Sequence, residues 1–237
     1  MPDVDVATNL ARVRERLAAA CARAGRPADS VGLVAVTKRI PLPLVAAVVQ
    51  AGQLDLGENR LQDALPRQDA LAGQLGRAAA PVRWHFIGHL QRNKAARAAG
   101  RFALIHGVHA TELAERLDRR AAELGLRQPV LLQVNATREP QKDGLAPDET
   151  VDVACAVAAF GHLDLRGLMA MARYGDGEAD LRRTFGSVRE LRDRARSACG
   201  LPLPELSMGM SDDFEAAILE GATLVRIGTA IFGPRPG

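Results

Sequence analysis

Several features are scarce or missing in this chain of 237 residues. Aromatic residues make up 3% of it, with one tryptophan and one tyrosine, which leaves too little stacking surface for a nucleic-acid-binding protein. No apolar run approaches the roughly 18 residues that a membrane span needs. The amino terminus carries no basic segment followed by an apolar one, as a secretory leader would. We therefore expect neither nucleic acid nor a membrane among the partners of this protein.

Cysteine is scarce as well, with three residues far apart in the sequence. An odd number of cysteines within helical patterns is typical of reduced thiols that pack as small hydrophobic side chains, which favours a cytoplasmic protein. A metal site at His85, His89 and His106 is conceivable, but no carboxylate or cysteine ligand stands at a supporting spacing. We expect no metal and interpret these histidines as hydrogen-bonded.

Lysine is the scarcest charged residue. The 31 basic residues include only three lysines, at positions 38, 94 and 142, and the others are arginine. Arginine stays protonated, whereas a desolvated lysine can lose its proton and attack a carbonyl group. Arginines and acids alternate along helical stretches and the net charge is only +3, so most of this charge is a solvated helix surface. We expect a chemical role for Lys38, while compositional bias explains Lys94 equally well.

Lys38 stands at the end of an apolar segment, residues 31–38. This segment does not alternate between polar and apolar residues, a pattern typical of a parallel strand buried on both faces. Val34, Val36 and Lys38 share one face because strand side chains repeat every two residues. Pro41 ends the strand and begins the next helix. The pattern predicts an amine at the carboxyl end of a buried strand.

Eight such segments alternate with helical patterns, spaced roughly 20–35 residues apart. The expected strands are 31–38, 53–56, 83–88, 104–108, 129–135, 165–171, 204–208 and 222–227. Alternation of this kind predicts an α/β fold, a single-domain TIM (β/α)8 barrel over residues 1–237. No helix is expected after the last strand, so the helix at 5–24 takes the eighth position of the outer ring. A doubly wound open sheet is the alternative, but its Gly-x-Gly-x-x-Gly fingerprint is missing.

Two turns that could bind an anion follow the last two strands. Residues 207–211 lead into a helix expected over 211–220, and Gly228 with Thr229 forms a second turn. Each turn alone is as well explained by an ordinary helix cap. Two of them beside a strand-end lysine favour a phosphate site, because TIM barrels bind phosphate in this region. Arg226 on an apolar strand needs a partner, which is either a ligand or a buried acid.

The segments at these strand ends resemble the YggS/PROSC family of pyridoxal-phosphate-binding homeostasis proteins. The similarity covers residues 30–233 and includes 34–38, 57–59, 84–94, 133–135, 142–144, 167–169, 206–217 and 225–233. The resemblance implies the barrel domain of alanine racemase without its carboxyl-terminal β domain. It also implies that pyridoxal 5'-phosphate (PLP) is the cofactor and is held covalently as an internal aldimine on Lys38.

The same resemblance implies the rest of the cofactor-binding set. Ser211, Gly228 and Thr229 correspond to the phosphate-binding residues, with Ser207 and Met210 close by. Arg226 corresponds to the residue that meets the pyridine nitrogen, and Asn59 to one that lines the pocket. The set is Lys38, Asn59, Met210, Ser211, Arg226, Gly228 and Thr229. Family members often have a second lysine where this chain has Ile40, so any role that needs an amine there is lost.

The resemblance implies a binding protein of intracellular PLP homeostasis with no robust turnover and no catalytic residues. An arginine at the pyridine nitrogen leaves that nitrogen unprotonated, which weakens the electron sink that PLP chemistry requires. PLP-dependent apoenzymes are the candidate recipients, and a monomer or weak dimer is expected. The alternatives are an amino-acid racemase and a Schiff-base aldolase with a phosphorylated substrate. A racemase needs a second proton donor, and Tyr174 is the only tyrosine present.

Overall fold

The computed structural model of this protein describes residues 4–234. Within that range eight parallel strands pair in sequence order and close into a barrel. The strands are β1 (Gly32–Val36), β2 (Asp55–Glu58), β3 (Arg83–Phe86), β4 (Leu104–Val108), β5 (Gln128–Val134), β6 (Leu163–Ala170), β7 (Glu205–Ser207) and β8 (Leu224–Ile227). The barrel closes where β1 pairs with β8, with Val34 beside Arg226. The TIM barrel prediction is confirmed, and the open-sheet alternative is wrong.

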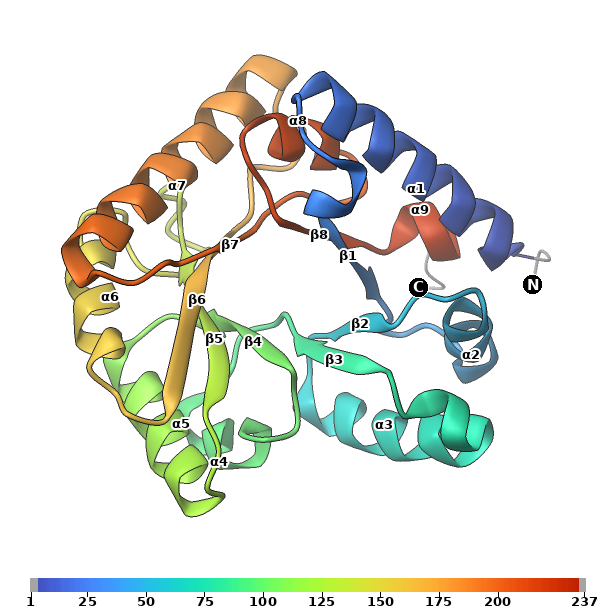
Figure 1. Ribbon diagram of the computed structural model, residues 1–237, viewed down its shortest axis with the longest axis horizontal. Coiled ribbons are helices and arrows are strands. Elements are labelled where there is room, and N and C mark those ends of the chain that lie inside the picture. Colours follow the sequence, from blue (N-terminus) through green and yellow to red (C-terminus); the bar gives the residue numbers. More distant parts are fainter. Residues whose placement is uncertain (1–3, 235–237) are drawn as a thin grey trace.

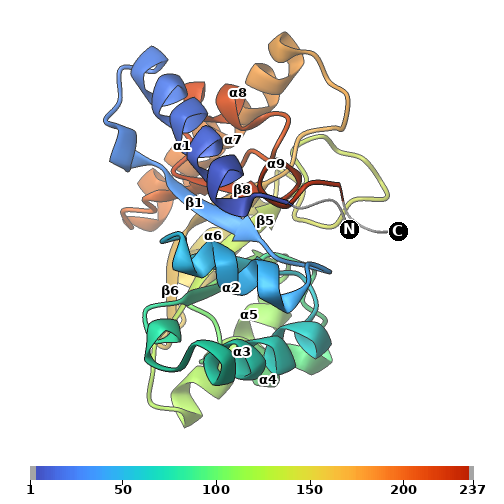
Figure 2. The same ribbon diagram turned by 90° about the vertical axis from the view of Figure 1, so that its right-hand side faces the viewer.

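Helices surround the strands (Figure 1). They are α1 (Val6–Arg23), α2 (Leu42–Gln50), α3 (Leu61–Leu75), α4 (Ala95–Ala98), α5 (Thr111–Glu123), α6 (Thr150–Ala158), α7 (Glu178–Cys199), α8 (Phe214–Leu219) and α9 (Thr229–Phe232). Helix α1 packs against α8, α9 and α2, so it covers the barrel where β8 meets β1. Figure 2 shows α1 and α2 on the outside of the barrel beside β1. None of the helices in the described part of the chain is long and apolar enough to span a membrane.

Two helix predictions differ from the structure. The helix expected over 211–220 begins only at Phe214, because residues 211–213 form a turn in front of it. A helix of four residues, α9, follows β8 although none was expected there. The expected domain also included residues 1–3 and 235–237, which lie outside the described residues.

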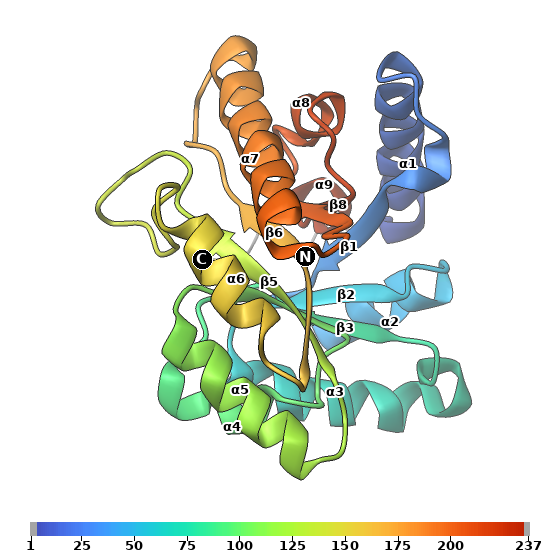
Figure 3. The same ribbon diagram turned by 60° about the vertical axis from the view of Figure 1, so that its left-hand side comes forward.

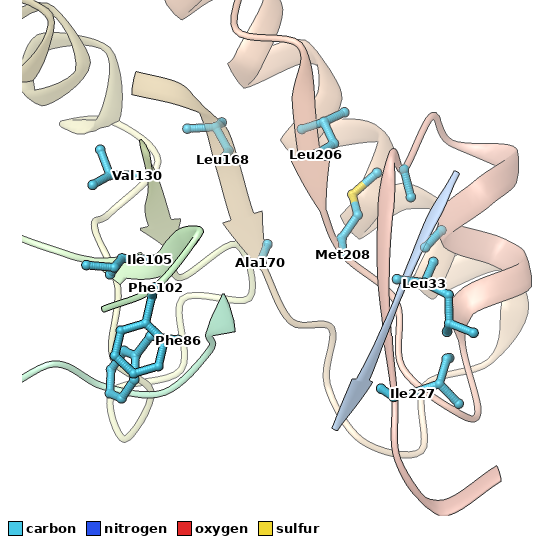
Figure 4. Packing of buried hydrophobic residues seen from close by; sticks show 14 of the residues in the cluster. Leu33, Phe86, Phe102, Ile105, Val130, Leu168, Ala170, Leu206, Met208 and Ile227 are labelled. Carbon is cyan, nitrogen blue, oxygen red and sulfur yellow. The ribbon is translucent and has the colours of Figure 1, made fainter. Parts of the chain in front are cut away.

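The main hydrophobic core lies between the strands and the helices. Leu33 and Ala35 of β1 belong to it together with apolar residues of every long helix. Phe86 and Phe102 are packed in this layer, with ring centroids 5.3 Å apart, and Figure 4 shows them beside Ile105 and Val130. A smaller cluster inside the barrel contains Leu104, Leu131 and Met169. Residues of one strand therefore alternate between two cores, as the absence of polar alternation in the sequence predicts.

Candidate functional site

The predicted cofactor-binding set lies on four consecutive strands of the barrel. The order β7–β8–β1–β2 places the seven residues at or just after the carboxyl ends of neighbouring strands. Parallel strands end on the same rim, and in TIM barrels that rim carries the active site. Side chains that are up to 191 positions apart in sequence, from Lys38 to Thr229, are thus brought to one side of one rim.

Lys38 lies in a tight turn, two residues beyond the end of β1. The prediction that it is the last residue of the strand is wrong, since the ladder stops at Val36. Ile40 N donates to the Thr37 carbonyl at 2.9 Å and closes the turn. Arg39 has a φ of 61°, in the left-handed region that non-glycine residues seldom occupy. The lysine side chain is half-buried. A constrained turn therefore carries Lys38 at the carboxyl end of β1.

The turn that carries Lys38 is fastened to α3 by a buried carboxylate. Glu58 is 1% exposed and accepts a hydrogen bond from Thr37 Oγ1 at 2.7 Å, while Arg67 Nε lies 3.1 Å from the same carboxylate oxygen. Arg67 Nη1 also donates to the Ile40 carbonyl at 2.5 Å. Burial raises the pKa of Glu58, against the opposing effects of Thr37 and Arg67. The pair could not be predicted from the sequence because it depends on the packing of α3 against β2.

Arg226 is buried in the barrel, and its partners there are a hydroxyl and a backbone carbonyl, whereas a ligand or a buried acid was expected. It is 4% exposed; Nη1 donates to Ser207 Oγ at 2.7 Å and Nη2 to the Ala170 carbonyl at 3.0 Å. Burial lowers the pKa of Arg226 to about 10, although the charge of Asp213 raises it. A guanidinium with that pKa stays protonated at neutral pH, so Arg226 can only donate hydrogen bonds.

The two predicted anion-binding turns meet in the structure. Ala230 N donates to Ser211 Oγ at 3.3 Å, which joins the turn after β7 to the first turn of α9. Gly209 has a φ of 96°, and a Cβ there would lie 2.8 Å from Phe214 Cα, so this position requires glycine. Gly228 is buried, and Thr229 is exposed at the start of α9. Backbone N–H groups at the start of a helix lack intrahelical partners and attract anions.

Two cavities open on the same rim. Asn59 lines one of about 170 Å³, and Met210 lines one of about 430 Å³. Lys94 borders the smaller cavity and Lys142 the larger, so all three lysines lie at this end of the barrel. Lys142 pairs with the carboxylate of Glu139 and donates to the Ala172 carbonyl at 3.2 Å. Lys142 belongs to the long β5–α6 loop, which projects from the barrel in Figure 3.

Of the three histidines, His85 and His106 have side-chain hydrogen-bond partners, and His89 faces a carboxylate. His85 and His106 lie inside the barrel, with Nδ1 of the first 3.0 Å from Nε2 of the second. His89 lies beyond β3, stacks on His109 and has its Nδ1 3.1 Å from Asp143. His89 therefore does not share a strand face with His85, because β3 ends at Phe86. Within residues 4–234 no group of three His, Cys, Asp or Glu side chains could hold a metal ion.

Two of the three cysteines lie next to each other in space. Cys155 of α6 and Cys199 of α7 are 44 residues apart in sequence, but their sulfur atoms lie 3.1 Å from each other. Burial and the neighbouring thiol raise the pKa of Cys199 to about 12. The three cysteines are reduced in the structure, as expected. The contact could not be found from sequence because it depends on how α6 packs against α7.

The rim thus combines a lysine in a constrained turn, a buried guanidinium that can only donate, and two turns joined by a hydrogen bond. An amine attacks carbonyl carbon, and a guanidinium binds a ring nitrogen or an oxygen acceptor. Helix starts and glycine turns bind phosphate. The donors therefore suit a small ligand with a carbonyl, a hydrogen-bond acceptor and a phosphate.

The family profile described as alanine racemase, N-terminal domain, matches residues 8–236. A relative in Pseudomonas aeruginosa is 44% identical over 97% of this chain and 96% of its own length. One in Escherichia coli K12 is 41% identical over 98% of this chain and 97% of its own length. Both relatives are named pyridoxal phosphate homeostasis protein.

Solved structures give the same result. PipY of Synechococcus elongatus, solved with PLP bound, is 36% identical with a TM-score of 0.84 and covers 97% of this chain and 100% of its own. An alanine racemase of Clostridium difficile has a TM-score of 0.72 at 16% identity, and this likeness shows the fold alone. The match covers 98% of this chain and 57% of that racemase.

Proposed function

The chain belongs to the family of pyridoxal phosphate homeostasis proteins, with the barrel fold of the alanine racemase N-terminal domain, and from that premise we propose that it binds PLP. We further propose that the cofactor is attached covalently to Lys38 and that the protein holds it or hands it on with no robust turnover. The name of its relatives and the bound PLP of PipY support the first statement. Lys38 supports the second, and this residue carries the proposal.

Each part of PLP has a suitable group on the rim. The aldehyde suits Lys38, since an amine on a half-buried turn can condense with it. The phosphate suits Ser211, Gly228 and Thr229, whose turns are joined by the bond from Ala230 N to Ser211 Oγ. The pyridine nitrogen suits Arg226, a buried donor. Asn59 and Met210 line two separate cavities on the same rim and are the remaining proposed cofactor contacts.

The arginine favours storage over catalysis. When bound, PLP supplies an electron sink, which works best with an acidic partner on its ring nitrogen. Arg226 has a pKa of about 10 and stays protonated, so it cannot give that nitrogen a proton at neutral pH. The residues of this chain therefore bind and orient the cofactor and do little to activate it. PLP-dependent apoenzymes in the cytoplasm are the proposed recipients, and a monomer or weak dimer is the proposed state.

Reduction with borohydride followed by peptide mapping tests this function. The chain has three lysines, so three variants cover every candidate: Lys38→Ala, Lys94→Ala and Lys142→Ala. We expect a reduced phosphopyridoxyl label on the peptide with Lys38, lost in Lys38→Ala and retained in the two controls. The fold of Lys38→Ala, checked by circular dichroism, should be intact. Label on Lys94 or Lys142 in the unaltered protein would exclude the assignment of Lys38.

A further inference from the structure

A line of hydrogen bonds crosses the barrel from Arg226 to the opposite, amino-terminal mouth. Arg226 Nη1 donates to Ser207 Oγ at 2.7 Å, and Ser207 Oγ lies 2.8 Å from His106 Nδ1. His106 Nε2 lies 3.0 Å from His85 Nδ1, and His85 Nε2 lies 3.1 Å from Asp55 Oδ1. The five residues come from β8, β7, β4, β3 and β2. We call them the barrel relay.

The relay is enclosed except at its far end. His106 and Ser207 are 0% exposed, and His85 is 6% exposed. Asp55 is half-buried and lines a cavity of about 540 Å³ at the amino-terminal mouth, to which residues from all eight strands or the positions just before them contribute. Buried polar groups are retained when every member has a partner, and such networks hold their members rigidly. The relay meets that condition along its whole length.

The two end residues of the relay determine the direction in which its hydrogen bonds are donated. Burial would raise the pKa of Asp55, but hydrogen bonds from His85 and Arg83 lower it below its usual range, so this carboxylate only accepts. Arg226, at the other end, only donates. Burial holds the pKa of His106 well below its usual range, and the charge of Arg226 acts in the same direction, so the imidazole of His106 is neutral.

One arrangement of hydrogens satisfies every bond with a single hydrogen on each imidazole. Ser207 accepts from Arg226 and therefore gives its own O–H hydrogen to Nδ1 of His106. His106 then carries its hydrogen on Nε2 and donates to His85 Nδ1, and His85 donates from Nε2 to Asp55. Each imidazole has one N–H and one acceptor nitrogen, as a neutral ring must. The reverse direction would need an additional proton on His85.

We propose that Asp55, His85 and His106 are positioning residues, which act through Ser207 to hold the guanidinium of Arg226 in the orientation that meets the ring nitrogen of PLP. The inference rests on the proposed function. A carboxylate at one mouth of the barrel thereby aligns a cofactor contact at the other. The Ala170 carbonyl fixes the second guanidinium nitrogen at 3.0 Å, so the relay and this carbonyl together leave Arg226 a single orientation.

The first test reads the hydrogens directly, in the protein without cofactor. Nitrogen-15 NMR of the histidine-labelled protein at pH 7 should show Nε2 protonated and Nδ1 unprotonated in both rings. Loss of one signal set in His106→Asn and of the other in His85→Asn assigns the two rings. A hydrogen on Nδ1 of His106 would overturn the proposed direction, whether or not the protein binds PLP.

The second test measures whether the relay strengthens the contact between Arg226 and the ring nitrogen of PLP. Binding of PLP is compared with binding of an analogue in which a C–H replaces the pyridine nitrogen, in His106→Leu and in His106→Asn. We expect His106→Leu to weaken PLP binding about tenfold, near the value of one charge-assisted hydrogen bond, and to leave the analogue unchanged. His106→Asn keeps a polar group facing Ser207 and should restore most of the PLP affinity.

Arg83→Gln is the matched control, because it removes the other partner of Asp55, at 2.6 Å, and leaves the relay in place. This variant should bind PLP as the unaltered protein does. Equal losses for PLP and the analogue in His106→Leu would show that the relay only supports the fold and would overturn the inference. If the unaltered protein binds neither compound, the proposed function fails, and the role in positioning the cofactor fails with it. The NMR result still decides the hydrogen-bond direction.

Discussion

Replacement of Arg67 by leucine should destabilise the protein by about 3 kcal/mol at pH 7, because it leaves the carboxylate of Glu58 buried without its cation. Breaking a buried ion pair costs about 3–5 kcal/mol. The side chain of Arg67 is 18% exposed, so water reaches the pair and the lower end of that range applies. Leucine keeps part of the apolar contact of the arginine stem, and the hydrogen bond to the Ile40 carbonyl is lost.

The stability lost in Arg67→Leu should depend on pH in a predictable direction. Burial raises the pKa of Glu58 in the folded protein, and the charge of Arg67 opposes that shift. Without Arg67 the folded-state pKa rises further above the unfolded value. A carboxyl group with a raised pKa favours folding when protonated, and that stability is lost as the pH rises through the folded pKa. The difference in free energy of unfolding between the unaltered protein and Arg67→Leu should therefore be largest at pH 7. It should shrink as the pH falls toward about 4, near the usual pKa of glutamate.

Urea unfolding at several pH values measures these free energies. Glu58→Gln in the Arg67→Leu background provides the control, because the amide still accepts the bond from Thr37 and carries no charge. The double variant should recover to within about 1 kcal/mol of the unaltered protein, since removing both charges avoids the buried unpaired one. A deficit that is constant from pH 4 to pH 7 and unaffected by Glu58→Gln would refute the buried-charge explanation.

Three further predictions concern the rim and the cysteines. Ser211→Ala and Thr229→Ala should each weaken PLP binding by about 1–3 kcal/mol in a fluorescence titration, whereas pyridoxal without its phosphate should be indifferent to both. The protein with saturating PLP should not exchange the α-hydrogen of L-alanine in deuterated water at an enzymatic rate, because Tyr174 is 92% exposed and a loosely held base loses the benefit of positioning. Fast exchange that Tyr174→Phe abolishes would contradict this. Treatment with a thiol oxidant should join Cys155 to Cys199, seen as the loss of two hydrogen masses, and Cys199→Ser should prevent it; an unchanged mass would contradict the short contact.

Several features of this protein follow from the sequence alone. The sequences of β1 and β5 do not alternate between polar and apolar residues, because both faces of these strands are buried. Such local patterns predicted all eight strands and therefore the barrel. Proline and glycine marked most element ends, but the end of the first strand was predicted at Lys38, two residues later than in the structure. The strand pattern continues through Thr37, whose N–H still bonds to Gly57 although the strand has ended.

The candidate site was predictable only in part. The order of strands in a barrel follows the sequence, so placing Lys38, Asn59, Ser211 and Arg226 on one rim needed no coordinates. The start of α8 at Phe214 was missed, because helical spacing continues back to Ser211 while the backbone of residues 211–213 turns away. Local sequence signals do not resolve such boundaries.

The sequence by itself determined the barrel and the rim that carries Lys38. Both follow from the period of apolar residues and from the fixed order of neighbouring strands. Only the tertiary structure decided which buried polar groups meet. His85 and His106 face each other, Arg67 reaches Glu58 and Cys155 touches Cys199 because of strand register and helix packing. These contacts join residues 9 to 44 positions apart through side chains, and no local pattern in the chain records a distance across the barrel.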